Sequence, residues 1–110
     1  MIMNSCSNHN ILSIGHRGAK GYVAENTYES ISKAIELNVD GIEIDVFKCA
    51  SGELVLFHDE DLKKLTGESG SIESLTIKEL EQFLVLGEYK IPTLEYVLTK
   101  IEEPIFINIE

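Results

Sequence analysis

Three short apolar stretches predict β-strands, at residues 10–15, 41–47 and 105–110. The second and third stretches alternate with period two, which is typical of strands that present two different faces. In the second stretch Glu43 and Asp45 share one face, and the opposite face is aliphatic. These two acids belong either to a solvated surface strand or to a binding site, because carboxylates on a buried strand need a partner.

Segments with helical spacing of apolar residues separate the strands. Asn26 is a suitable N-cap for the first, with Glu29 in the position of a capping-box acid, and Thr76 with Glu79 repeats this pattern later in the chain. Strand, helix and strand joined by short connections form a βαβ unit, which implies parallel strands and a right-handed crossover. The predicted helices cover residues 26–37, 76–84 and 92–101.

A turn signal at residues 50–52 follows the second strand, and the apolar run at residues 53–59 comes after it. This order predicts a hairpin-like excursion from the main sheet. Its return strand ends at His58 and Asp59, so that both side chains lie at a strand end.

The strands and helices together predict an α/β fold. Three parallel strands leave two unprotected sheet edges, which favour pairing with further strands or with another copy of the chain. We therefore expect residues 10–110 to be the first part of a larger domain, with a possible homo-oligomer if the chain folds alone. Residues 1–9 are polar and are expected to form a flexible leader.

Composition excludes several classes of function. Nine basic against nineteen acidic residues give a net charge of −10, which disfavours nucleic acid and anionic membranes as partners. No segment approaches the ~20 apolar residues of a membrane span, and the apolar run after the leader is too short for a signal peptide. We expect a cytoplasmic protein with reduced thiols. Cys6 and Cys49 do not make a disulfide framework, and neither receives a role.

Acidic residues collect at the predicted C-terminal ends of the strands, where α/β folds place their functional residues. Glu110 has the same strand parity as Glu43 and Asp45, so that all three carboxylates are expected on one side of the sheet. Oxygen ligands without cysteine suit a hard divalent cation, Mg²⁺ or Ca²⁺. The sequence therefore predicts one divalent-cation site at this end of the sheet.

Two histidines and an arginine occupy neighbouring strand ends. His16 and His58 suit proton transfer because imidazole titrates near neutrality, although a single histidine at a strand end is more often structural. Arg17 is either a surface cation or a fork of donors for a phosphate. Three ionised acids and one divalent metal sum to −1, so that an anionic substrate needs such a cation. Asp59 is a turn residue or an orienting partner of its neighbour.

These residues and their order resemble the N-terminal part of the glycerophosphodiester phosphodiesterase family. The resemblance implies a (β/α)8 TIM barrel, of which this chain carries about the first three βα units plus a β-hairpin insertion. It also implies a divalent cation and hydrolysis of a small glycerophosphodiester to an alcohol and glycerol 3-phosphate. The matching segments run from residue 11 onwards and are His16-Arg17-Gly18, Glu25-Asn26-Thr27, Glu43-Ile44-Asp45-Val46, His58-Asp59, Ile91-Pro92-Thr93-Leu94-Glu95 and Asn108-Ile109-Glu110.

The resemblance also implies roles for individual residues. The metal ligands would be Glu43, Asp45 and Glu110. The general acid and base would be His16 and His58, and Arg17 would contact the phosphate. The family often carries an arginine and two threonines where this chain has residues 62–67, which puts the substrate preference in question. Its third-strand motif normally continues to a lysine, but the sequence stops first.

A complete barrel needs about 250 residues, so we expect this chain to be a truncated part of the enzyme. Two alternatives to the main hypothesis remain. One is a lysophospholipase D-like activity on lipid-linked diesters, and the other is a non-catalytic module that binds metal or phosphate.

Overall fold

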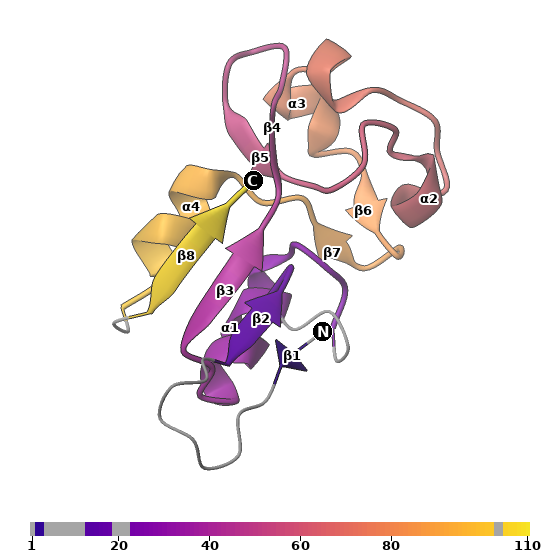
Figure 1. Ribbon diagram of the computed structural model, residues 1–110. Helices are drawn as coiled ribbons and strands as arrows, with labels where there is room; N and C mark the ends of the chain where they lie inside the picture. Colours follow the sequence, from indigo (N-terminus) through magenta and orange to yellow (C-terminus); the bar gives the residue numbers. More distant parts are fainter. Residues whose placement is uncertain (1, 4–12, 19–22, 103–104) are drawn as a thin grey trace.

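A four-stranded sheet forms the base of the molecule in the computed structural model (Figure 1). Its strands are β1 (Ile2–Met3), β2 (Ile14–His16), β3 (Gly41–Ile44) and β8 (Phe106–Ile109), in the order β1-β2-β3-β8. β2, β3 and β8 are parallel, as the βαβ pattern predicted, and β1 pairs antiparallel with β2. The structure describes residues 2–3, 13–18, 23–102 and 105–110.

Most of the predicted leader lies outside the described residues, apart from the two that form β1. The flexible leader therefore stays a prediction. Among the described residues, no helix has both the length and the apolar character that crossing a membrane requires.

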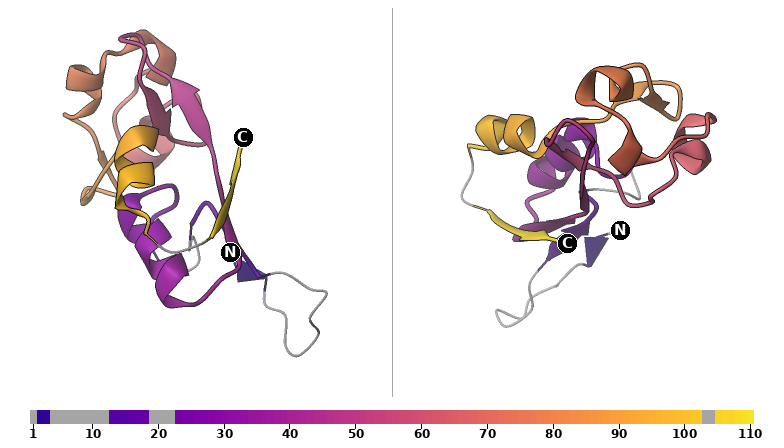
Figure 2. Two further views of the ribbon diagram at one scale, coloured as in Figure 1. Left: turned by 90° about the vertical axis from the view of Figure 1, so that its left-hand side faces the viewer. Right: turned by 90° about the horizontal axis from the view of Figure 1, so that it is seen from above.

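Two helices, α1 (Tyr28–Glu36) and α4 (Leu94–Lys100), cover one face of the sheet (Figure 2). Their buried residues form one apolar cluster with the aliphatic face of β3, which explains why this face excludes polar residues. The aliphatic face of β3 thus meets the helices. The buried cluster contains Ile31, Ala34, Val39, Ile42, Ile44, Leu56 and Val97.

The N-cap of α1 is Thr27, and the prediction of Asn26 was wrong by one residue. The Thr27 hydroxyl accepts a hydrogen bond from the Ser30 backbone N–H at 3.0 Å. Asn26 has a positive φ of 53° and lies before the cap. Its side chain is engaged elsewhere, at Asp45, so that it does not cap the helix.

The predicted strand at residues 41–47 is interrupted at Asp45. β4 (Val46–Lys48) leaves the main sheet and pairs antiparallel with β5 (Leu54–Leu56), which confirms the hairpin. The Asp45 carbonyl accepts a hydrogen bond from the Phe57 N–H at 3.0 Å instead of pairing within the sheet. The hairpin therefore rises beyond the C-terminal end of β3 (Figure 1).

A second buried apolar cluster is formed mainly by residues of the segment between β4 and α4, and includes Phe57, Leu62, Ile72 and Leu80. Short elements surround it, and the predicted helix at residues 76–84 is shorter than expected. The capping box of Thr76 is present. These elements are α2 (Lys63–Thr66), the 3-10 helix η1 (Ile72–Ser74), α3 (Ile77–Leu80), β6 (Leu84–Val85) and β7 (Tyr89–Lys90).

The early end of the helix has a physical cause. β6 pairs antiparallel with β7 around a turn in which Leu86 and Gly87 have positive φ values of 53° and 72°. This turn lies beyond the predicted helix. The helix ends earlier because the backbone hydrogen bonds tighten after Leu80, where the Phe83 N–H donates to the Leu80 carbonyl at 3.1 Å, and β6 then begins at Leu84. The later predicted helix likewise starts after Pro92, because the Thr93 hydroxyl caps it by accepting from the Tyr96 N–H at 3.0 Å.

Candidate active site

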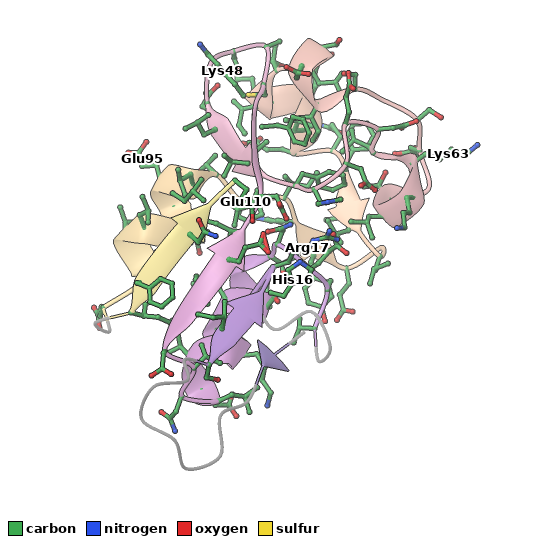
Figure 3. The ribbon with its side chains drawn as sticks, in the orientation of Figure 1. His16, Arg17, Lys48, Lys63, Glu95 and Glu110 are labelled. Carbon is green, nitrogen blue, oxygen red and sulfur yellow. The ribbon has the colours of Figure 1, made fainter. Side chains whose placement is uncertain are left out.

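His16 and Glu43 face each other across neighbouring parallel strands. Their Cα atoms are register partners, and His16 Nε2 lies 3.2 Å from Glu43 Oε2. Glu43 is only 8% exposed. Figure 3 shows His16, Arg17 and Glu110 gathered at the C-terminal ends of β2 and β8. The structure thus brings these predicted residues to one end of the sheet.

Arg17 follows β2 and is held by two acids. Its Nη1 donates to Glu25 Oε2 at 2.9 Å, and its Nε lies 3.3 Å from Asp45 Oδ2. The second contact has ion-pair distance but not hydrogen-bond geometry, so we treat it as a charge contact alone. The Arg17 side chain is 13% exposed, and Glu25 is a partner to which the sequence pattern assigned no role.

Asn26 makes two hydrogen bonds to Asp45. Its Nδ2 donates to Asp45 Oδ2 at 3.0 Å, and its Oδ1 accepts from the Asp45 backbone N–H at 3.1 Å. Its own backbone N–H donates to the Arg17 carbonyl at 2.9 Å. The only sequence feature that points to Asn26 is the Glu25-Asn26-Thr27 run. This run predicted a helix start and not a contact of Asn26 with an acid.

Negative charge accumulates around Glu43. The pKa of Glu43 is raised from 4.5 to about 7, mainly by burial and further by the charge of the Asp45 carboxylate and a side-chain hydrogen bond with it. The charge of Glu110 also raises this pKa, whereas the Arg17 guanidinium lowers it. The three predicted ligands therefore lie close enough to influence one another electrostatically.

This donor set fits a divalent cation in its chemistry. The charges of Asp45 and Glu110 both act on Glu43, and a hard cation with oxygen ligands would offset this repulsion. As placed, however, no group of three or more His, Cys, Asp or Glu side chains within the described ranges forms a metal cage. Metal ligation by Glu43, Asp45 and Glu110 stays a prediction.

His58 follows β5 at the end of the hairpin, and its Nδ1 lies 2.7 Å from Asp59 Oδ1. An ionised carboxylate only accepts hydrogen bonds, so this contact favours the proton on Nδ1 and leaves Nε2 as the basic nitrogen. Asp59 is thus placed as an orienting partner. The Phe57 N–H bond to the Asp45 carbonyl ties the segment before His58 to the end of β3.

Two surface cavities lie beside α4, with volumes of about 820 and 600 Å³. Tyr28, Glu29 and Tyr96 line the larger cavity, and Leu54 and Leu98 line the smaller one. Neither of these two cavities is lined by any of the six predicted site residues.

Comparisons with known proteins agree on one family. Residues 16–110 match the model of the glycerophosphoryl diester phosphodiesterase family. A glycerophosphodiester phosphodiesterase of Caldanaerobacter subterraneus is 37% identical over 107 residues, covering 90% of this chain and 44% of that protein. The chain thus spans less than half the length of this relative.

Solved structures give the same result. A glycerophosphodiester phosphodiesterase from Thermotoga maritima matches with a TM-score of 0.81 and 39% identity, over 93% of this chain and 44% of that one. A phosphodiesterase from Oleispira antarctica, solved with the product sn-glycerol-3-phosphate, matches with a TM-score of 0.77 and 29% identity, over 88% and 43% of the two chains. These neighbours are TIM-barrel proteins, so the predicted fold class is confirmed for the part that the chain covers.

Proposed function

Because the chain belongs to the glycerophosphoryl diester phosphodiesterase family, we propose that it carries the catalytic residues for hydrolysis of glycerophosphodiesters to an alcohol and glycerol 3-phosphate. The observation that carries this proposal is the grouping of His16, Arg17, Glu43 and Asp45 at the C-terminal ends of adjacent parallel strands. The glycerol 3-phosphate bound to the Oleispira antarctica phosphodiesterase supports the class of substrate.

We propose that Glu43, Asp45 and Glu110 hold one divalent cation, Mg²⁺ or Ca²⁺. Their shared electrostatic environment and their hard oxygen donors support this assignment. Such a cation, when bound, would offset negative charge on the phosphate during the reaction. Arg17 supplies a further positive charge beside Asp45 and would help to hold the phosphate.

His16 and His58 are proposed to move the protons. One imidazole takes the proton of the glycerol hydroxyl next to the phosphate. The oxygen of that hydroxyl then attacks phosphorus and forms a cyclic phosphate. The other gives a proton to the departing alkoxide as the ester P–O bond breaks. Water then opens the cyclic phosphate, and the two histidines exchange roles. The 2.7 Å contact between His58 Nδ1 and Asp59 supports a basic Nε2 for one of these steps.

Turnover of glycerophosphocholine by the wild-type chain, His16→Ala and His58→Ala, with Mg²⁺ or Ca²⁺ and with a chelator, tests the proposal. His9→Ala is the matched control, because the sequence gives His9 no role. Lost turnover with retained metal affinity in both site variants supports acid–base catalysis. Unchanged turnover in either variant would rule out the assigned role.

The same assay separates the alternatives. Metal binding without turnover by the wild-type chain would favour a binding module. Preference for lysophosphatidylcholine over glycerophosphocholine would favour the lysophospholipase D-like activity. The cytoplasmic location and the pairing of copies stay predictions from the sequence.

A further inference from the structure

The buried side-chain amide of Asn26 hydrogen-bonds to one acid of the candidate site, Asp45. Asn26 is 2% exposed, and its carboxamide makes both of its Asp45 hydrogen bonds within about 3 Å, one to the backbone and one to the carboxylate. The Asp45 N–H can only donate, so it must face the amide oxygen. The amide nitrogen must then face the carboxylate, which fixes the orientation of both side chains.

The backbone of Asn26 is held in place by its own conformation and hydrogen bonds. Its positive φ of 53° suits asparagine, which tolerates the left-handed region better than most residues. Its N–H donates to the Arg17 carbonyl, and the same carbonyl accepts from the Ser30 hydroxyl at 3.1 Å. Thr27 caps α1 directly after it. The amide is therefore presented from a backbone anchored to the β2 loop and to the start of α1.

Asp45 needs such support because it lies between two elements. β3 ends at Ile44 and β4 begins at Val46, so no strand includes Asp45. Its carboxylate also lies close to that of Glu43, and whenever both groups are ionised their like charges favour a rotation of the two carboxylates away from one another. A second contact, from Arg17 Nε, reaches the same oxygen as the Asn26 amide, at 3.3 Å.

We propose that Asn26 is a positioning residue that holds the Asp45 carboxylate in place for a divalent cation. The inference rests on the proposed function, and it gives Asn26 a role beyond the helix start that its sequence suggests. Partners that orient metal ligands typically contribute 10- to 100-fold to metal affinity. A purely structural role in α1 would change stability without changing affinity in this way.

The test compares Asn26→Gly with Asn38→Gly in calorimetric titrations of the metal-free chain with Mg²⁺ and with Ca²⁺. Glycine tolerates the left-handed backbone at both positions, and Asn38, with a φ of 59°, is exposed after α1. We expect N26G to bind at least about 10-fold more weakly and N38G to bind as the wild type does. Equal affinities for N26G and the wild type would overturn the inference alone, whereas absent binding by the wild type would overturn the proposed metal site as well.

Asn26→Asp provides a second variant that keeps the acceptor for the Asp45 N–H and replaces the donor by a carboxylate. Positioning predicts weaker cation binding, because the new carboxylate turns Asp45 away. Charge alone predicts tighter binding, because the site gains an acid, and this result would contradict the inference. Hydrogen exchange of the Asp45 amide supplies an independent readout. Faster exchange in N26G than in N26D is expected, and equal exchange would contradict the hydrogen bond from the Asp45 N–H to the residue 26 side chain.

Discussion

Glu43→Gln should stabilise the metal-free protein at neutral and alkaline pH. Glu43 is 8% exposed and lies near the charges of Asp45 and Glu110, with Arg17 the only opposing charge among the causes that shift its pKa. A glutamine keeps the shape and an acceptor for His16, but it carries no charge. The substitution therefore removes repulsion without opening a cavity.

The raised pKa of Glu43 gives the sign and the size of this effect. A folded-state pKa of about 7, against 4.5 in the unfolded chain, means that the folded state binds more protons between these values. The ionised carboxylate therefore costs nothing below about pH 4.5, and its cost is complete above about pH 7. At roughly 1.4 kcal/mol per pKa unit the limit is about 3 kcal/mol. Water at the open end of the sheet lowers this value, and we expect about 1–2 kcal/mol.

Thermal unfolding in a chelator at pH 5 and pH 8 measures the effect. At roughly 4 °C per kcal/mol for a domain of this size, E43Q should melt about 4–8 °C above the wild type at pH 8, with a smaller difference at pH 5. Glu95→Gln, on the exposed face of α4, is the matched control. Addition of Mg²⁺ or Ca²⁺ should raise the melting temperature of the wild type and not that of E43Q. Equal or lower stability of E43Q at pH 8 would refute the electrostatic reasoning.

Three further predictions test separate features of the structure. Thr27→Ala should lower the free energy of unfolding by about 1 kcal/mol in urea titrations, because Thr27 caps α1 through Ser30. Glu29→Ala should leave this free energy nearly unchanged. A larger loss in E29A than in T27A would restore the original capping prediction. Asp59→Asn should lower kcat at least about 10-fold without changing cation affinity in calorimetry, because the carboxylate fixes the tautomer of His58; an unchanged kcat would remove Asp59 from the site. Leu86→Asn should stabilise the chain by about 1 kcal/mol in chemical denaturation, since Leu86 has a φ of 53° and is 61% exposed; a loss of stability would show that its side chain matters to the turn.

The sequence predicted the parallel arrangement because apolar periodicity and short connections leave few topologies for a strand, a helix and a strand. It also predicted which strand ends carry the acids and His16, since parallel strands end at one side of a sheet. The interruption of β3 was not predicted, because it depends on contacts of Asp45 with Asn26 and Phe57 that lie far away in the chain. A strand pattern reports alternation and does not report such partners.

The helix cap shows the same limit at shorter range. Asn26 with Glu29 and Thr27 with Ser30 are two capping frames that differ by one residue, and local rules accept either of them. The hydrogen bonds of Asn26 to Asp45 select the second frame. The pairing of Arg17 with Glu25 was missed for a related reason, because the conformation of a loop is not encoded in hydrophobic periodicity.

The most direct test of the central claim is a crystal structure grown with Ca²⁺ or Mg²⁺. We predict one cation at the C-terminal ends of β3 and β8, with carboxylate oxygens of Glu43, Asp45 and Glu110 at about 2.3–2.6 Å for Ca²⁺ or about 2.0–2.1 Å for Mg²⁺. A cation bound elsewhere, or a saturated crystal in which these three carboxylates stay apart, would contradict it.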